Sequence, residues 1–411
     1  MRVIGPYAGW SCLLLVIILL VLSAGCTDRG AEQGSTTVAG EDYRTVVDSR
    51  GVAVQVPMTI ERVVTVSDGL IEGTMTSLGV QDTIVGLGSS CLQRNFNYEF
   101  PTVHGESYWY RDGMNPVTYL NRWMMDLPLA AQSGAGANFE TIAALDPDVI
   151  ILRVGSCPMR SPDDEGVIMT IQTIESLGYP LIVIYGPPAF DNPDLTKVSE
   201  EIKIIGEVFG KEAEAEVLAN YLESQTHIVY DRTKNIPDAE KPTVLAFGAS
   251  PNARNAGGAG NVKGTNTFES YFIEDIVHAK NAFQNPGSPT ISAEQLLALD
   301  PDVIVLGTAN GYHPPEELYS APYYQNVAEL QAVKNQRVYA LPWTPCNCAK
   351  RLEYPIDIMV FAKAAYPDLF EDIILSEWLL DFYKNVYGVD HDTAIALRSA
   401  QWMDWCVEDG I

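Results

Sequence analysis

The chain has 411 residues, of which 47% are hydrophobic and 19% are charged, and its formal net charge is −27. A surface this acidic repels phosphate backbones, so we expect no nucleic-acid partner. The overall charge gives no help in holding an anionic solute, which would need local Arg, Lys or backbone donors.

The first 26 residues have the features of an export signal, which lies outside the mature fold. Arg2 supplies a positive charge, Leu13 to Leu22 is an uninterrupted apolar run, and Leu22-Ser-Ala-Gly-Cys26 resembles the lipobox of exported lipoproteins. A retained membrane anchor is the alternative, but spanning a bilayer takes about 20 apolar residues and this run is shorter. We therefore expect lipidation at Cys26, followed by a flexible tether over residues 27–42.

Short apolar segments after the tether predict the start of an α/β domain. Residues 43–57 alternate between apolar and polar on both sides of a turn at residues 48–51, which predicts a β-hairpin. Residues 63–66 and 84–87 are expected to form strands, with a helix over residues 69–78 between them. Asp68 directly precedes this helix and is its expected N-cap.

Residues 89–130 are unusually aromatic, and the segment has two interpretations. It can be a flap over a large apolar or planar ligand, because aromatic faces provide contact area and specific geometry. It can equally be an insertion that packs onto its own lobe, and the sequence leaves both open. The aromatic residues are Phe96, Tyr98, Phe100, Tyr108, Trp109, Tyr110, Tyr119 and Trp123.

One stretch occurs twice, as residues 138–152 and again as residues 292–306. In both copies, apolar residues at helical spacing lead into Asp-Pro-Asp and then into an apolar run, as in a parallel strand covered on both faces. Proline disfavours helix at the residue before it, so the helices should end at Asp146 and Asp300. One such helix-to-strand step in each half predicts two similar α/β lobes.

The segment between the two copies has the pattern of a long helix. Residues 194–234 carry apolar side chains spaced three, four or seven apart, which predicts one amphipathic helix of about 40 residues. Two helices with a break near Gly206 or Gly210 are the alternative. A single helix of this length would connect the two lobes.

Together, these segments resemble the helical-backbone (class III) substrate-binding lipoproteins of ABC importers, which capture ferric siderophores, haem and cobalamin. Besides the duplicated step, residues 61–66, 330–343 and 362–370 agree with the pattern of that family, and the resemblance covers roughly residues 45 to 390. It implies an α/β fold of two Rossmann-like lobes with mostly parallel sheets, joined by one long α-helix. The implied parts are an N-terminal lobe at 43–192, a connecting helix at 193–236 and a C-terminal lobe at 237–411.

The resemblance also implies a function. The protein would be a monomer anchored by lipid on the extracytoplasmic face of the cell membrane, without a cofactor and without enzymatic activity. It would hold an iron chelate, haem or a corrinoid between its lobes and deliver this ligand to an ABC permease and its ATPase. A protein that captures free metal ions and a surface lipoprotein without a ligand are the alternatives.

The ligand site is expected in the loops that follow the strands, because open parallel sheets bind ligands beyond the carboxyl ends of their strands. Arginine suits the oxygens of carboxylates, phosphates or catecholates, so Arg254 and Arg351 are the leading pocket cations. Pairing of each arginine with a surface acid is the alternative. The predicted ligand-binding residues are Ser89, Ser90, Arg94, Trp109, Asn252, Arg254, Tyr312, Trp343 and Arg351.

Without Cys12 and Cys26 the number of cysteines is odd, although exported proteins usually pair their cysteines in disulfides. The remaining cysteines are Cys91, Cys157, Cys346, Cys348 and Cys406. Cys91 and Cys157 both follow strands of the first lobe, so a disulfide between them is geometrically reasonable. Cys346-Asn-Cys348 lacks the two-residue spacing of zinc knuckles. A disulfide to another loop and a soft-metal contact both remain open for this pair.

Docking onto the permease is a further implication of the resemblance. In that family each lobe presents a surface carboxylate to arginines of the permease, and Glu72 matches the position in the first lobe. In the second lobe the corresponding helix, about residues 267–279, offers Glu269, Glu274 and Asp275, of which Glu274 is our choice. The alternative is that these acids simply belong to a very acidic surface.

Overall fold

The computed structural model describes residues 42–132, 136–190, 194–307, 314–343 and 351–411. The N-terminal lobe is built on a four-stranded parallel sheet with the order β10 (Leu181–Tyr185), β9 (Val149–Val154), β3 (Val63–Val66) and β4 (Ile84–Leu87). β3 and β9 are buried along their whole length, as their continuous apolar runs predict. The predicted hairpin forms β1 (Tyr43–Val47) and β2 (Ala53–Pro57).

The C-terminal lobe has a second, mixed sheet. Its order is β14 (Thr290–Ile291), β12 (Gly260–Val262), β11 (Thr243–Gly248), β15 (Val303–Leu306) and β16 (Val338–Ala340), and β13 (Lys280–Asn281) also pairs with β11. β11, β13, β15 and β16 are parallel, whereas β12 runs antiparallel to its neighbours. The predicted α/β class with two sheets, one from each half of the chain, is confirmed.

The duplicated sequence forms the same step in both lobes. α3 (Phe139–Leu145) leads into β9 and α9 (Ala293–Leu299) into β15, and the helices end at Asp146 and Asp300, whose φ angles are 42° and 36°. The second aspartate of each motif then fastens the neighbouring strand. Asp148 Oδ2 accepts hydrogen bonds from the backbone of residues 61 and 62, and Asp302 Oδ2 accepts one from the Thr243 amide at 2.8 Å. The predicted helix ends are confirmed.

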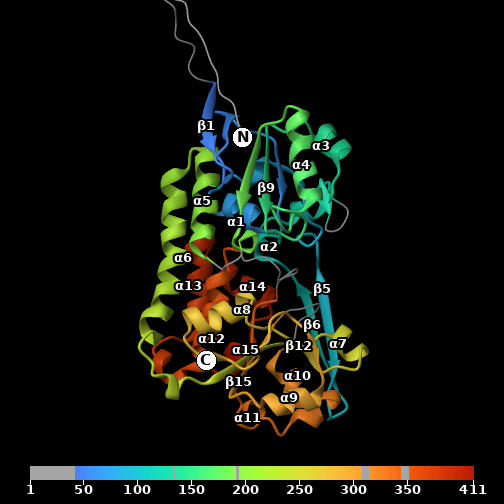
Figure 1. Ribbon diagram of the computed structural model, residues 1–411, viewed down its shortest axis with the longest axis vertical. Helices are drawn as coiled ribbons and strands as arrows, with labels where there is room; N and C mark the ends of the chain where they lie inside the picture. Colours follow the sequence, from blue (N-terminus) through green and yellow to red (C-terminus); the bar gives the residue numbers. More distant parts are fainter. Residues whose placement is uncertain (1–41, 133–135, 191–193, 308–313, 344–350) are drawn as a thin grey trace, which may run out of the picture. The chain divides into compact units, whose positions relative to one another are not determined.

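The connector differs from the predicted single helix. α5 (Thr196–Phe209) and α6 (Glu212–Thr233) are separate helices that lie side by side (Figure 1), and Gly210 ends the first with a φ of 64°. Close packing between them requires Gly206, because a Cβ there would clash with the Cβ of Ala215. The prediction of one long helix is therefore wrong, and the alternative with a break near Gly210 is confirmed.

Further helices cover the two sheets (Figure 1). In the N-terminal half they are α1 (Leu70–Ser77), η1 (Gln81–Thr83), α2 (Pro116–Leu120), η2 (Arg122–Asp126), α4 (Glu165–Ser176) and η3 (Pro187–Ala189). In the C-terminal half they are η4 (Asp238–Glu240), α7 (Pro251–Asn255), α8 (Phe268–Tyr271), η5 (Phe272–Ile276), α10 (Pro315–Ser320), η6 (Pro322–Val327), α11 (Gln331–Lys334), α12 (Tyr354–Ala365), η7 (Pro367–Phe370), α13 (Leu375–Tyr387), α14 (His391–Ala400) and α15 (Trp405–Glu408).

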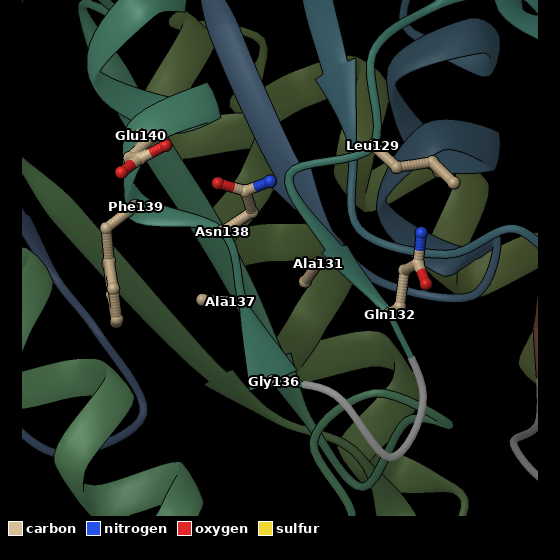
Figure 2. Close-up of a pocket in the computed structure, with 8 residues that line it drawn as sticks. All are labelled: Leu129, Ala131, Gln132, Gly136, Ala137, Asn138, Phe139 and Glu140. Carbon is tan, nitrogen blue, oxygen red and sulfur yellow. The ribbon is translucent and has the colours of Figure 1, made fainter.

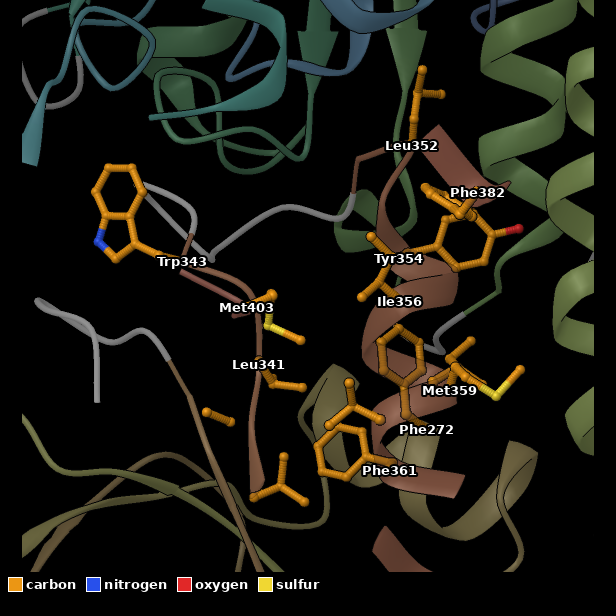
Figure 3. Close-up of a cluster of buried hydrophobic side chains, with 14 of the residues drawn as sticks. Phe272, Leu341, Trp343, Leu352, Tyr354, Ile356, Met359, Phe361, Phe382 and Met403 are labelled. Carbon is orange, nitrogen blue, oxygen red and sulfur yellow. The ribbon is translucent and has the colours of Figure 1, made fainter. Parts of the chain in front are cut away.

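α12 is the central helix of the C-terminal core. Every residue of this helix except Asp357 is buried, as expected for a helix that is apolar on all sides. Figure 3 shows its side chains, among them Met359 and Phe361, interleaved with Phe272 of η5 and Phe382 of α13. Across the described ranges between residues 42 and 411, no helix is long and apolar enough to cross a membrane.

Replacing Gly210 with alanine should destabilise the protein more than the same change at Gly388. Both glycines end a helix with a φ of 64°, so both changes incur the strain of a left-handed alanine, roughly 1 kcal/mol. An added Cβ at Gly210 would also displace the guanidinium of Arg44 from its hydrogen bonds to the carbonyls of Glu207 and Met58, whereas nothing lies within 4 Å of one at Gly388. In urea denaturation, the free energy of unfolding should therefore fall by about 2 kcal/mol in Gly210→Ala and by about 1 kcal/mol in Gly388→Ala. Equal losses would contradict this account of the helix break.

Candidate functional site

Polar residues gather beyond the carboxyl ends of the N-terminal strands, where a ligand site is expected. Ser67 and Asp68 follow β3, Ser89 follows β4, and Ser156 and Cys157 follow β9; all five are buried. The structure corrects one detail, because Asp68 is not the N-cap of α1. Gly69 takes that position, and the Ser67 hydroxyl accepts hydrogen bonds from the amides of residues 69 and 71 instead.

Asp68 belongs to a buried charge cluster that the sequence analysis missed. Arg153, which is fully buried near the end of β9, forms two hydrogen bonds to Glu201 of α5, at 2.6 and 2.9 Å. Its Nη1 lies 3.6 Å from Asp68 Oδ1, and Asp68 Oδ2 accepts a hydrogen bond from the Cys157 amide at 3.2 Å. Burial raises the pKa of Glu201, and the charge of Arg153 opposes that rise. An arginine at the end of an otherwise apolar strand was the available sequence signal.

Glu72 does not lie on the surface, so that prediction is wrong. Its side chain is 0% exposed and accepts a hydrogen bond from the Thr65 hydroxyl of β3 at 2.5 Å. Loss of hydration raises the pKa of this carboxyl, and the bond from Thr65 only partly offsets that rise. A carboxylate on this inner face of α1 cannot meet a permease without unfolding the helix.

The remaining predicted ligand residues differ in accessibility. Arg94 and Asn252 are exposed, in the loop after β4 and in α7 after β11, and Ser90 is half-buried. Ser89 is buried, and its hydroxyl accepts a hydrogen bond from the Cys91 amide at 3.2 Å. Tyr312 and the two cysteines Cys346 and Cys348 lie outside the described residues.

The two leading cations are both bound to other parts of the protein. Arg254 Nη1 donates to the Ala249 carbonyl at 2.7 Å and lies 3.3 Å from Glu317, while its guanidinium stands over the ring of Tyr323. Arg351 is 5% exposed and donates through Nε to the Asp68 carbonyl at 2.5 Å. Each guanidinium therefore has a structural partner, and a ligand contact by either one stays a prediction.

The aromatic segment forms the antiparallel strands β5 (Phe96–Pro101) and β6 (Ser107–Gly113), which pack against the C-terminal lobe. Phe96 stacks on Trp343 at a centroid distance of 5.5 Å, and Trp343 is only 3% exposed. The Trp402 indole donates to the Arg111 carbonyl at 2.9 Å. These contacts support the packing interpretation for this face of the hairpin, whereas Trp109, on the other face, is 54% exposed.

Glu317 joins this hairpin to the second lobe. It is fully buried in α10 and accepts hydrogen bonds from the hydroxyls of Tyr98 at 2.7 Å and Tyr323 at 2.6 Å, in addition to its ion pair with Arg254. Burial and the facing carboxylate raise the pKa of both tyrosines. The cluster connects β5 with α7, α10 and η6, so it fixes the hairpin on the second lobe.

The cysteines of the first lobe are oxidised. Cys91 and Cys157 are each disulfide-bonded, and their pairing with one another stays a prediction. Cys406 is a free, buried thiol whose pKa is raised to about 12 by desolvation. Among the described residues, no group of three or more His, Cys, Asp or Glu side chains is arranged to hold a metal ion.

Two pockets lie at the two edges of the N-terminal sheet. The first, of about 410 Å³, is formed by β7 (Ala131–Gln132), β8 (Gly136–Ala137) and the start of α3, where Figure 2 shows Asn138 between Ala137 and Glu140. The second, of about 640 Å³, lies between the β1–β2 turn, the end of β10 and α5. None of the predicted ligand residues that the structure describes lines either pocket.

Truncation of Glu317 should destabilise the protein strongly, whereas truncation of its neighbour Glu316 should not. Glu317→Ala leaves a partly buried guanidinium, the buried hydroxyl of Tyr98 and the partly buried hydroxyl of Tyr323 without their shared acceptor, a loss of about 3 kcal/mol. Glu316→Ala, on the same helix but half-exposed, should change stability by less than about 0.5 kcal/mol. Chemical denaturation of the two variants measures the difference. Similar stabilities would show that the Glu317 cluster does not hold the hairpin.

Comparison with known proteins places this geometry in a family. A family model described as periplasmic binding protein matches residues 78–344, more than half of the chain. The molybdate-binding protein MolA of Haemophilus influenzae is 25% identical over 282 residues, which are 64% of this chain and 73% of MolA.

Solved structures share the fold. A periplasmic solute-binding protein of Veillonella parvula superimposes with a TM-score of 0.68 at 19% identity, over 90% of this chain and 100% of its own. The molybdate-bound structure of MolA superimposes with a TM-score of 0.60 at 20% identity, over 84% of this chain and 98% of its own. The chain therefore belongs to the periplasmic binding protein family, in the helical-backbone class whose members serve ABC importers.

Proposed function

We propose that this protein captures a metal complex, of the iron-chelate, haem or corrinoid class, and delivers it to an ABC permease and its ATPase. One observation supports this proposal most directly. Arg94 and Asn252 are exposed polar donors, and they follow strands of different sheets, one in each lobe. Donors that approach a solute from two lobes suit a ligand with several oxygen acceptors.

A compact oxyanion is the second candidate ligand. The similarity to the molybdate-binding protein MolA favours it, and so does the packing of Phe96 and Trp343 against one another. Aromatic rings that stack within the protein are not available to sandwich a large planar solute. The same exposed donors would serve both ligands.

Titration calorimetry with a ferric catecholate siderophore, haem, cyanocobalamin and sodium molybdate distinguishes the two candidates. We expect one of the first three to bind, and Arg94→Ala to weaken its affinity about tenfold or more, because a hydrogen bond to a charged group contributes roughly 1.5–3 kcal/mol. Arg122→Ala, also an exposed arginine but outside the strand-end loops, is the control and should bind normally. Binding of molybdate alone would establish the second candidate, and binding of none of the four would refute both.

We further propose that lipid on Cys26 anchors the mature protein to the outer side of the cytoplasmic membrane. The lipobox-like end of the apolar run supports this, and residues 27–42 would act as the tether. In cell fractionation, the wild-type protein should sediment with membranes and Cys26→Ala should not be lipid-modified. A substituted protein that still carries lipid would disprove the assignment.

Contact with the permease is proposed for the second lobe only. Glu274 is half-buried and accepts hydrogen bonds from the Gln284 side chain at 3.1 Å and from the Asn281 amide at 3.4 Å. Its neighbour Asp275 is exposed, and Glu269 is buried. We propose that Glu274, whose carboxylate is oriented by these hydrogen bonds, provides the charge that faces the permease.

A further inference from the structure

The N-terminal helix α1 is in direct contact with the second lobe. Leu352, two residues before α12, lies against Gly73 of α1: a Cβ added at Gly73 would be 3.3 Å from Leu352 Cδ1. Figure 3 shows Leu352 at the start of α12, at the edge of the C-terminal core. At the end of α1, the Ser77 hydroxyl donates to the Val386 carbonyl of α13 at 2.6 Å. Two segments of the second lobe, one just before α12 and one at the end of α13, therefore contact this helix.

Arg351 makes the polar part of the same contact. Its Nε donates to the carbonyl of Asp68, the last residue before the turn into α1, and both residues are buried. A hydrogen bond from a guanidinium to a buried carbonyl is strong because the donor is charged and water is excluded. The bond holds the end of β3 to the second lobe.

Gly69 shows how closely the arginine approaches this turn. Its φ is 127°, a conformation that residues with a side chain rarely adopt. A Cβ at this position would be 2.8 Å from Arg351 Nε and 3.4 Å from Asn115 Nδ2. The turn thus has the one residue type that allows the arginine side chain to approach the backbone this closely.

Asp68 transmits this contact to the neighbouring strand. Its carboxylate accepts the hydrogen bond from the Cys157 amide, in the loop after β9, and faces Arg153, which is held by Glu201. Moving the Asp68 backbone would therefore shift an acceptor on which the loop after β9 depends. Both loops lie at the carboxyl edge of the sheet, where solute binding is expected.

We propose that Arg351 is a positioning residue, which latches the second lobe onto the Asp68–Gly69 turn and, through the Asp68 carboxylate, fixes the loop after β9 at the solute-binding edge. The latch explains why a conspicuous arginine in a binding protein is buried against a backbone carbonyl. The inference rests on the proposed function only in taking this edge as the solute site. The latch itself is a property of the solute-free protein.

Hydrogen exchange of the full chain without solute, followed by mass spectrometry, tests the latch. In Arg351→Ala, amides of residues 68–73 and of residues 155–159 should exchange about tenfold faster than in the wild type, the loss expected for one charge-assisted bond. Amides of β10, which lies in the same sheet but outside the latch, should keep their protection. Arg351→Met keeps a long apolar stem but has no hydrogen-bond donor, and it should show the same pattern if the alanine variant fails to fold.

Arg337→Ala is the matched control. This arginine also lies in the second lobe and donates to backbone carbonyls, those of Ala364 and Ala365 at 2.9 and 3.0 Å, but it is not in contact with α1. It should leave exchange at residues 68–73 and 155–159 unchanged. Asp68→Asn should accelerate exchange at residues 155–159, because an uncharged oxygen is a weaker acceptor for the Cys157 amide.

The inference is overturned if residues 155–159 exchange at the wild-type rate in Arg351→Ala and Arg351→Met, or if Arg337→Ala accelerates them equally. In the first case Arg351 would only secure the turn, and in the second the effect would be general loss of stability. Since no solute is present, a negative result refutes the latch without bearing on the proposed ligand, and failure of every solute to bind leaves the latch standing.

Discussion

The charge of Arg153 is the constraint on which the N-terminal lobe depends. A guanidinium removed from water must be paired with acceptors, because an unpaired buried charge costs several kcal/mol. Glu201 provides two of these acceptors and Asp68 faces the third nitrogen. The pairing joins β9 to α5 on one side and to the end of β3 on the other. The strand ends and the helix that leads toward the second lobe are thereby held in one arrangement.

Contacts between the lobes extend this arrangement to the rest of the chain. The β5–β6 hairpin belongs to the N-terminal half in sequence but is fixed on the second lobe by Glu317 and by the stack of Phe96 on Trp343. Arg351 holds the turn before α1 from the other direction. The Glu317 cluster, the Phe96–Trp343 stack and the Arg351 bond all oppose relative motion of the lobes, in addition to the covalent connection through α6. A binding protein built this way would take up its solute with little rearrangement.

The chemistry of the site follows from how its arginines are used. Arg153, Arg254 and Arg351 are the conspicuous cations of the strand ends, yet each one bonds to carboxylates or carbonyls of the protein. In a chain with a net charge of −27, such internal pairing leaves Arg94 as the exposed cation among the predicted ligand residues that the structure describes. An anionic solute would be bound mainly by directed hydrogen bonds.

The sequence by itself determined the local features: the hairpin, the strands and the two helix ends at Asp146 and Asp300, because proline sterics and apolar runs act over a few residues. Tertiary structure decided the features that depend on distant neighbours. The apolar spacing of residues 194–234 is the same for one helix as for two that bury a common face, so only the packing of Gly206 on Ala215 fixed the reversal at Gly210. Glu72 is buried because α1 packs that carboxyl onto Thr65 of β3, a contact that depends on how the helix folds back onto the sheet. Arg351 bonds to the Asp68 carbonyl, and no local pattern records a contact across 283 residues.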